Sequence, residues 1–332
     1  MIADIVRAPS RTEQPSLFEL APRVLDGADV PFEQRELGAR LSPELRLGTM
    51  SWSFAGWRGV VYGENVSPKL LAESGLTAYA KHPLLRTVEI DRSFYDPLPA
   101  SYFVGASRQV PDDFRFVVKA HEACTLLRFP EHTRYGKRRG DTNERYLDAA
   151  YTSDAVVAPV AEGLGEKLGV LLFQFVPQDV GHPRAFAERL HTFLAALPRG
   201  VPYAVELRNP ELLTRDYAAA LDGLALHAHN VWGSMPSVLE QARLIPPRAR
   251  KPLVVRWLMR RGDDYESARS RFLPFSRLVE PDLPNRRAIA TLIAKALAHG
   301  VPAFVVVNNK AEGSAPASIF ELARAILQQE QL

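Results

Sequence analysis

Eight short apolar runs recur along this chain, and most of them end in charged or amide side chains. Runs of this length that are apolar throughout are typical of strands buried on both faces of a parallel sheet. Eight such strands with helices between them predict an α/β fold, a closed (β/α)8 TIM-type barrel. The runs are Leu45–Trp52, Leu85–Phe94, Phe114–His121, Leu168–Phe175, Tyr203–Asn209, Leu224–Asn230, Pro252–Met259 and Ala303–Lys310.

Helical patterns lie between these runs, as a barrel requires. Arg184–Leu197 carries apolar residues at helical spacing and is followed by Pro198. Arg286–His299 is closed by Gly300, and Ser314–Gln329 begins with a residue suited to an N-cap. These segments predict the later helices of the outer ring.

The length of the chain predicts one domain with an extension. A barrel needs about 250 residues, and the chain has 332. We expect residues 45–332 to form the barrel. We expect residues 1–44 to form a partly irregular N-terminal extension, because they show no clean period and contain Pro9, Pro15, Pro22 and Pro31.

A short peptide in this extension suggests a partner. Gln14 to Phe18 reads Gln-Pro-Ser-Leu-Phe, which resembles the peptide by which bacterial proteins dock on the replication sliding clamp. The alternative is that Leu17 and Phe18 cover the bottom of the barrel. The sequence does not decide between these two hypotheses.

Composition narrows the cellular setting. No apolar run approaches the roughly 20 residues that cross a bilayer, and Met1–Ser10 lacks an apolar signal core. Cys124 is the single cysteine, so an intrachain disulfide or a thiolate metal cluster is excluded, and we expect a buried, inert thiol. We expect a cytoplasmic protein without a membrane partner.

Basic residues gather in the segment after the third strand, and the net charge is +3. If this segment lies near the barrel mouth, it would attract anionic ligands or nucleic acid. A solvated loop is the alternative. The residues are Arg134, Lys137, Arg138, Arg139 and Arg145.

Three strand ends carry pairs of ionisable residues two positions apart. Alternate residues of a strand share a face, so Glu206 and Arg208 point the same way, as do Glu89 and Asp91, and Lys119 and His121. The carboxyl ends of barrel strands meet at one mouth, where active sites lie. These pairs predict a substrate site, with a ring of salt bridges that plugs the barrel as the alternative.

Residue type suggests a role for each side chain. Glu206 and Glu89 are the predicted proton-transfer residues, because paired carboxylates serve acid–base chemistry. Basic side chains would hold a phosphate or carboxylate, amides would bond sugar hydroxyls, and aromatic rings would stack on the ligand. The predicted ligand-binding residues are Trp52, Asp91, Tyr95, Lys119, His121, Gln174, Arg208, Arg256, Asn308 and Asn309. Gly313 and Ser314 open the last helix, which is a second place for a phosphate, with simple helix capping as the alternative.

No cofactor is predicted. The chain has no Walker loop, no Gly-x-Gly-x-x-Gly after a strand and no Gly-x-Ser-x-Gly elbow. His227 and His229 form a His-x-His pair that could hold a divalent metal with a third ligand, but the same histidines could pack in the core. The metal site is therefore the minor alternative.

Six of these segments resemble the YecE-like family, known as domain of unknown function 72. The segments are Leu47–Trp52, Thr87–Tyr95, Phe116–Ala120, Gly169–Gln174, Ala204–Arg208 and Val307–Asn309. The resemblance covers about residues 45–330 and implies a TIM-type barrel of bacterial or archaeal origin, without an established activity.

The chain departs from the family pattern at positions that matter for chemistry. Asp91 stands where the family usually has Asn, Leu126 where it often has His, and Leu258 where it usually has His. Lys310 follows the last amide pair in place of the usual Asp. Any chemistry that needs those family residues would be lost, and this part of the rim becomes more basic.

These observations favour an enzyme that acts on a phosphorylated or nucleic-acid-like, sugar-containing substrate by acid–base or hydrolytic chemistry. The expected ligand is a small anionic compound or sugar phosphate. The alternative is a non-catalytic nucleic-acid-binding or DNA-repair accessory module, suggested by the arginine-rich segments and the clamp-like peptide. A metal-dependent carbohydrate isomerase is a third hypothesis.

Overall fold

A computed structural model describes residues 24–63, 66–260 and 262–330. Within them, parallel strands pair in sequence order around a closed barrel, and β8 pairs back with β1 from Leu45↔Ala303 to Thr49↔Val307. This confirms the predicted (β/α)8 barrel. The strands are β1 (Leu45–Thr49), β2 (Thr87–Ile90), β3 (Arg115–Lys119), β4 (Leu168–Phe175), β5 (Tyr203–Leu207), β6 (Leu226–Val231), β7 (Leu253–Trp257) and β8 (Ala303–Val307).

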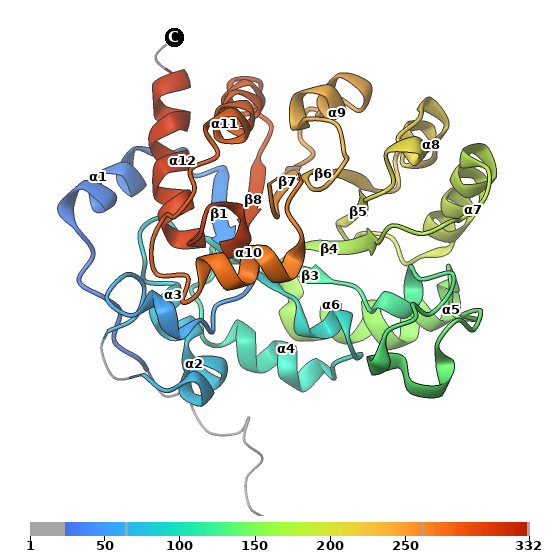
Figure 1. The fold of residues 1–332 in the computed structure, drawn as a ribbon, viewed down its shortest axis with the longest axis horizontal. Helices are drawn as coiled ribbons and strands as arrows, with labels where there is room; N and C mark the ends of the chain where they lie inside the picture. Colours follow the sequence, from blue (N-terminus) through green and yellow to red (C-terminus); the bar gives the residue numbers. More distant parts are fainter. Residues whose placement is uncertain (1–23, 64–65, 261, 331–332) are drawn as a thin grey trace, which may run out of the picture.

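Helices surround the barrel (Figure 1). The three helices predicted in the second half are present as α7, α11 and α12, with ends within three residues of the predicted ones. The helices are α1 (Phe32–Arg40), α2 (Pro68–Ser74), α3 (Leu76–Tyr79), α4 (Ala100–Ser107), α5 (Ala149–Thr152), α6 (Ala158–Leu164), α7 (Pro183–Ala196), α8 (Arg215–Ala220), α9 (Val238–Leu244), α10 (Tyr265–Phe272), α11 (Leu283–Ala298) and α12 (Ala315–Gln329).

The apolar core has two parts, and the strands divide their residues between them. One part lies between the strands and the helices. The other fills the barrel and includes Val117, Leu172, Ala204, Val254 and Val306. Because side chains alternate along a strand, the residue two positions later on each strand also points inward, nearer the carboxyl end.

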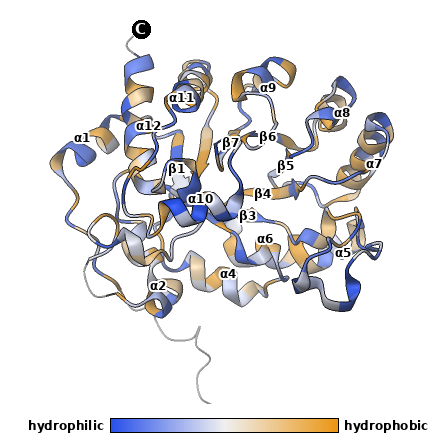
Figure 2. Cartoon of the chain, viewed as in Figure 1, coloured by the Kyte–Doolittle hydropathy of each residue, from blue (hydrophilic) through white to orange (hydrophobic). Residues whose placement is uncertain are grey.

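That rule places the polar side chains of the site. The inward positions that follow these five apolar residues hold Lys119, Gln174, Glu206, Arg256 and Asn308. Each of these strands is apolar along most of its length and has one inward-facing polar residue at its carboxyl end. The barrel therefore has an apolar interior and a charged mouth. Figure 2 shows apolar strands and the hydrophilic helix α10, which lies below β7 and β8 in the view of Figure 1.

The described part of the predicted extension lies against the barrel. Helix α1 contacts α12, the amide of Leu25 donates to Thr77 Oγ1 over 2.9 Å, and Gly27 pairs with Tyr62 in an isolated bridge. The clamp-like peptide Gln14 to Phe18 lies outside the described residues. Among those described, none of the helices combines the length and apolarity needed to cross a membrane.

Cys124 follows β3 and is fully buried, as predicted. Thr152 Oγ1 donates to its sulfur over 3.3 Å. Burial raises the pKa of the thiol to about 12, so Cys124 stays protonated at neutral pH.

Candidate functional site

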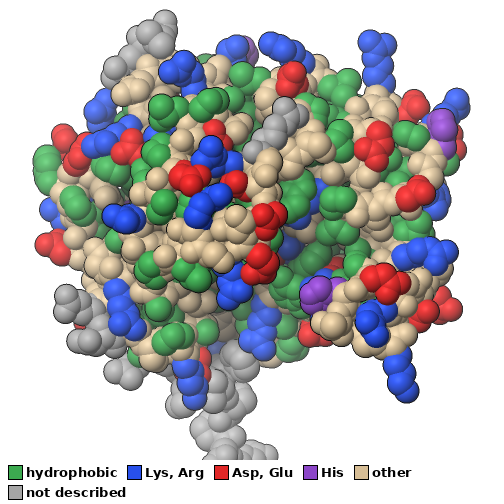
Figure 3. Space-filling model, in the orientation of Figure 1, with side chains coloured by type: hydrophobic (Ala, Val, Ile, Leu, Met, Phe, Trp, Pro, Cys, Tyr) green, Lys and Arg blue, Asp and Glu red, His purple; other side chains and the backbone are tan. Residues whose placement is uncertain are grey.

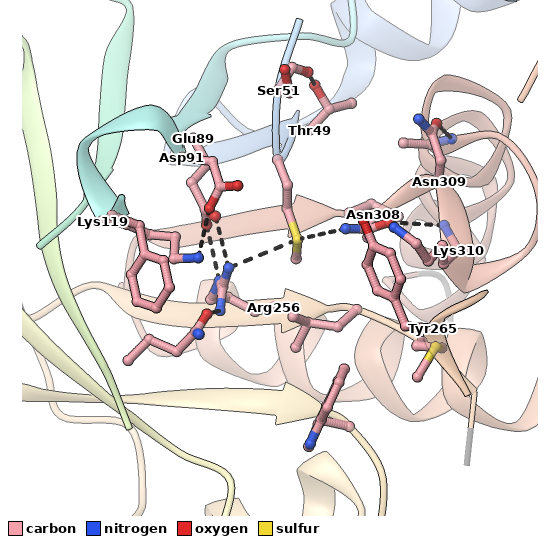
Figure 4. Close-up of a pocket in the computed structure, with 18 of the residues that line it drawn as sticks. Thr49, Ser51, Glu89, Asp91, Lys119, Arg256, Tyr265, Asn308, Asn309 and Lys310 are labelled. Atoms are coloured by element: carbon pink, nitrogen blue, oxygen red, sulfur yellow. Dashed lines mark hydrogen bonds and ion pairs between the residues drawn. The ribbon is translucent and has the colours of Figure 1, made fainter. Parts of the chain in front are cut away.

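A cavity of about 580 Å³ opens at the carboxyl ends of the strands. Nine of the predicted site residues line it, because the strands end at one mouth and the side chains that point into the barrel meet there. Figure 4 shows part of this lining, with Arg256 between Lys119 and Lys310. The predicted residues that line it are Glu89, Asp91, Tyr95, Lys119, Gln174, Arg208, Arg256, Asn308 and Asn309.

Arg256 is the centre of the cavity floor, and its guanidinium is fully committed to protein acceptors. Nε and Nη2 donate to the two oxygens of Glu89 over 2.9 and 2.7 Å. Nη1 donates to Glu206 and, over 3.1 Å, to Gln174 Oε1, and Nη2 also faces Met50 Sδ at 3.8 Å. These contacts account for all five N–H donors of an arginine. Arg256 therefore organises the floor rather than offering donors to a ligand.

Glu206 lies beneath the cavity and does not line it. Its side chain is completely buried, Oε1 accepts from Arg208 Nε over 2.7 Å, and Oε2 accepts from Arg256. Burial alone would raise the pKa of this carboxyl, but the guanidinium groups of Arg256 and Arg208 outweigh it and lower the pKa to about 2. Glu206 is thus ionised throughout the neutral range, with both oxygens occupied.

Glu89 differs from Glu206 although both contact Arg256. Glu89 reaches the cavity wall and is also fully buried as a residue. Here burial dominates and raises the pKa of the carboxyl, while the charges of Arg256 and Lys119 offset part of that rise. One guanidinium therefore holds two carboxylates whose pKa values move in opposite directions.

Lys119 and Asp91 form the ion pair on one side of the cavity. Lys119 Nζ lies 2.6 Å from Asp91 Oδ1 and 3.8 Å from the centre of the Phe94 ring. The Lys119 side chain is only 7% exposed, whereas that of Asp91 is 36% exposed. Burial lowers the pKa of Lys119, and the charge of Asp91 partly restores it. The pair joins a buried cation to a carboxylate that a ligand can reach.

Arg208 lines the cavity and has N–H groups that remain available to a ligand. Its guanidinium lies 4.1 Å from the centre of the Trp232 ring. Within the described residues, Nε is bonded to Glu206 and Nη2 to Gln174 Oε1 at 2.9 Å. An arginine has five N–H groups, so this side chain can still donate into the cavity. Trp232 and Gln174 fix the plane in which it does so.

The two asparagines after β8, Asn308 and Asn309, use side-chain oxygens to bond other parts of the protein. Asn309 Oδ1 accepts from Trp57 Nε1 at 3.2 Å and from the backbone amide of Ala315 at 2.8 Å. Asn308 Oδ1 accepts from the amide of Lys310 at 2.9 Å. The first-turn amide of α12 at Ala315 is therefore occupied, and Pro316 has none. This arrangement weakens the phosphate site predicted at the start of α12.

Two predicted site residues lie away from the cavity. Trp52 donates from Nε1 to the carbonyl oxygen of Leu71 on α2, at 3.2 Å. His121 Nδ1 lies 2.6 Å from Tyr151 Oη and borders a second cavity of about 410 Å³, which shares Tyr95 with the first. Both residues follow the last paired residue of their strands, Thr49 and Lys119, so the alternation of the strand no longer sets their direction.

The His-x-His pair faces the helices. His227 contacts Tyr217 Oη at 3.0 Å and Gln241 Oε1 at 3.2 Å, and the two histidine rings lie 4.7 Å apart. The inward residue between them is Ala228. In the part of the chain that the structure describes, no group of three or more His, Cys, Asp or Glu side chains is placed to hold a metal ion. Hydrogen bonds within the core account for His227, and His229 is buried beside it.

The structure adds aromatic walls that the sequence did not reveal. Trp232 follows β6, Tyr265 begins α10 and Phe275 follows it, and all three line the cavity. The long segment between β7 and α11 was the available signal, because long loops in compact domains are commonly binding elements. Nothing in the strand pattern pointed to Trp232.

The charges around the cavity are unequal in number. Among the described residues, five basic side chains and two carboxylates line the cavity, and the buried carboxylate of Glu206 lies beneath it. Together they leave an excess of two positive charges. The basic residues are Arg92, Lys119, Arg208, Arg256 and Lys310, and the acidic ones are Glu89, Asp91 and Glu206. Such a site favours anionic ligands.

A parallel eight-stranded barrel with an ion-paired, positively charged mouth defines a TIM-type barrel protein with a candidate site at the carboxyl ends of its strands. The chain belongs to the family described as protein of unknown function DUF72, whose model matches residues 46–332. This agrees with the YecE-like resemblance found in the sequence.

Known proteins similar to this chain include a curated relative and solved structures. UPF0759 protein YunF of Bacillus subtilis is 32% identical over 114 residues, which span 33% of this chain and only 34% of that protein. A DUF72 family protein of Thermotoga maritima has a TM-score of 0.56 and 19% identity, covering 85% of this chain and 99% of its own. One from Enterococcus faecalis V583 has a TM-score of 0.55 and 17% identity, covering 87% and 98%. These structures support the fold alone.

Proposed function

We propose that the barrel mouth binds a small anionic, sugar-like compound and that the protein is an enzyme that transfers protons on it. The observation that carries this proposal is that the basic side chains at the cavity differ in how many of their N–H donors the protein already uses. Arg256 is saturated by the protein, whereas Arg208 and Lys119 line the cavity with donors that remain. A built scaffold that presents two cations is what recognition of a phosphate or carboxylate requires.

Arg208 and Lys119 hold the anionic group in this proposal. Glu206 and Arg256 act as the positioning pair: together they fix Arg208, and the low pKa of Glu206 keeps that support charged. This changes the role predicted for Glu206 from proton transfer to positioning, because Glu206, unlike Glu89, is not among the residues that line the cavity.

Proton transfer then belongs to Glu89 and Asp91. Glu89 lines the cavity and has a raised pKa, which favours its protonated form and a role as general acid. Asp91 is the more exposed carboxylate and is held by Lys119, which favours a role as general base.

The shape and walls of the cavity support a sugar-sized ligand. Its volume of about 580 Å³ falls in the range of roughly 300–1,000 Å³ typical of small-molecule sites. Tyr95, Trp232, Tyr265 and Phe275 offer ring faces or edges against which a sugar or a base can pack. A cytoplasmic location, where phosphorylated metabolites are plentiful, is part of the proposal.

The nucleic-acid alternative has less support from the geometry. On the face in Figure 3, Lys and Arg side chains are interspersed with Asp and Glu side chains. In the arginine-rich segment, Arg134 packs over Tyr135, Arg138 over Phe129 and Arg145 over Tyr151. These contacts give the arginines a structural task. The sliding clamp stays a predicted partner of residues outside the described ranges.

A thermal-stability panel tests the proposal. Glucose 6-phosphate, ribose 5-phosphate and gluconate would be compared with uncharged glucose on the wild-type protein, on Arg208→Gln and on Arg184→Gln. Arg184 is a suitable control because it forms an exposed ion pair on α7, remote from the cavity lining. We expect at least one anionic compound to raise the melting temperature of the wild type and the control, but not of Arg208→Gln. No effect of any anion, or an equal effect of glucose, contradicts the proposal.

Turnover is tested on the compound that stabilises most. Mass spectrometry would follow its conversion by the wild type and by Glu89→Gln. We expect Glu89→Gln to bind with similar affinity but to lose turnover. Full turnover by this variant removes Glu89 from the mechanism.

A further inference from the structure

Lys310 is a cavity residue that the proposed proton chemistry does not use. It follows β8 in the short turn Asn309–Ala311, lines the cavity and is only 9% exposed. The bonds of Asn309 to Trp57 and to Ala315, and of Asn308 to the Lys310 amide, fix the backbone of this turn. The position of Lys310 is therefore set by the fold.

The ammonium group of Lys310 packs on an aromatic ring. Nζ lies 3.9 Å from the centre of the Tyr265 ring, and Figure 4 shows the two side chains next to each other. Among the described residues, no carboxylate lies within 4 Å of it, in contrast to Lys119 with Asp91 at 2.6 Å. Tyr265 and the turn that carries Lys310 belong to different elements, and contacts between α10 and this turn hold them together.

The surroundings of Lys310 disfavour its protonated form. Burial is the largest effect, and the positive charge of Arg269 on α10 adds to it. Asp91 and Glu266 act in the opposite direction without compensating. The net result is that the pKa of Lys310 falls to about 8. Burial beside a second cation is a recognised way to activate a lysine as a nucleophile.

We propose that Lys310 is a nucleophile that forms a Schiff base with an aldehyde or ketone group of the anionic ligand. Neutral Nζ donates its lone pair to the carbonyl carbon, the π electrons move to the carbonyl oxygen, and one N–H proton passes to that oxygen to give the carbinolamine. The hydroxyl group then leaves with the second N–H proton as water, and the nitrogen and carbon become joined by a double bond. The step needs no oxidant, reductant or further reactant.

This inference rests on the proposed function, because the ligand is the same one. Lys119 and Lys310 lie on opposite sides of Arg256 in Figure 4. A ligand whose anionic group meets Lys119 and Arg208 would direct its other end toward Lys310. The fitting substrate class is thus a phosphorylated or carboxylated sugar in its open, carbonyl form.

The selectivity expected for Lys310 is large. A pKa of about 8 in place of 10.5 makes the neutral fraction of the amine near pH 7 roughly 300 times that of an ordinary lysine. Exposed lysines such as Lys69 are therefore expected to react far more slowly at this pH.

Borohydride trapping tests the proposal. The protein would be incubated at neutral pH with glyceraldehyde 3-phosphate or with uncharged glyceraldehyde, reduced with sodium cyanoborohydride and mapped by peptide mass spectrometry. A trapped imine adds the mass of the carbonyl compound less one oxygen atom. The variants are Lys310→Arg, which keeps the positive charge, and Lys69→Arg, a control whose side chain is 86% exposed on α2. Circular dichroism would establish that each variant is folded.

We expect the adduct on Lys310 in the wild type and in Lys69→Arg, with at least about tenfold less total adduct in Lys310→Arg. An even distribution over exposed lysines, or the same yield in Lys310→Arg, overturns the proposal. Melting temperatures measured with glyceraldehyde 3-phosphate distinguish the proposed anionic-ligand site from the proposed Schiff base on Lys310. Stabilisation without an adduct on Lys310 contradicts only the Schiff-base proposal. The absence of both stabilisation and adduct contradicts the Schiff-base proposal and the proposed function. An equal adduct from glyceraldehyde supports the nucleophile and contradicts the anionic ligand.

Discussion

Replacing Glu206 by glutamine removes one negative charge from a completely buried network while keeping the shape of the side chain. In the folded protein the pKa of Glu206 falls from an ordinary 4.5 to about 2. Each tenfold change in acid dissociation corresponds to about 1.4 kcal/mol, so the fold favours the ionised carboxyl by about 3 kcal/mol. Removing one partner of a buried ion pair costs about 3–5 kcal/mol. We therefore expect Glu206→Gln to lower the free energy of unfolding at pH 7 by about 3 kcal/mol.

The effect has a definite pH dependence. A lowered pKa stabilises the folded protein above the ordinary pKa, and this stabilisation is lost as the pH falls through the folded-state pKa. The difference between wild type and Glu206→Gln is thus full above pH 5 and falls to less than half by about pH 3. The comparison of two proteins at each pH cancels the titration of groups that they share.

Urea denaturation followed by circular dichroism at pH 7 and pH 3 measures this difference. Glu188→Gln is the matched control, because Glu188 pairs with Arg184 on the exposed face of α7. Exposed pairs contribute about 0–1 kcal/mol, so the control should stay within that range at both pH values. A loss of less than about 1 kcal/mol in Glu206→Gln at pH 7 would refute the account of the floor network.

Three further predictions follow from the cavity and its surroundings. Asn309→Ala leaves the buried indole N–H of Trp57 without its acceptor, and we expect a loss of about 2 kcal/mol in urea denaturation; an unchanged unfolding midpoint would exclude a positioning role. The yield of the Lys310 adduct should rise with pH about a midpoint near 8, because the neutral amine is the reacting form, and a midpoint above 10 would contradict the burial argument. Cys124, with a thiol pKa of about 12, should resist iodoacetamide at pH 8 in the folded protein and react in urea; rapid labelling of the native protein would show that it is accessible.

The barrel and most of its site were predictable because one rule governs both. Apolar strands buried on both faces specify a parallel sheet, and alternation along each strand assigns Lys119, Gln174, Glu206 and Arg256 to the inward face. The same rule explains the histidines: His227 has the opposite parity to Ala228, so it faces the helices.

The remainder depended on information that no strand pattern contains. Alternation gives the face but not the depth, so Glu206 was expected in the cavity and lies below its floor. Trp52 and His121 lie after the paired strand residues, where the backbone turns. Tyr265 reaches the cavity only because α10 crosses the mouth, a long-range arrangement. The pairing of Arg256 with both glutamates likewise joins strands far apart in sequence.

A crystal structure of the protein with the sugar phosphate that stabilises it most would test the central claim directly. The account predicts that the phosphate oxygens lie within hydrogen-bond distance of Arg208 and Lys119, with Arg256 still bonded to Glu89 and Glu206. Phosphate bound outside the barrel mouth, or bound there by Arg256 after its release from the two glutamates, would contradict it.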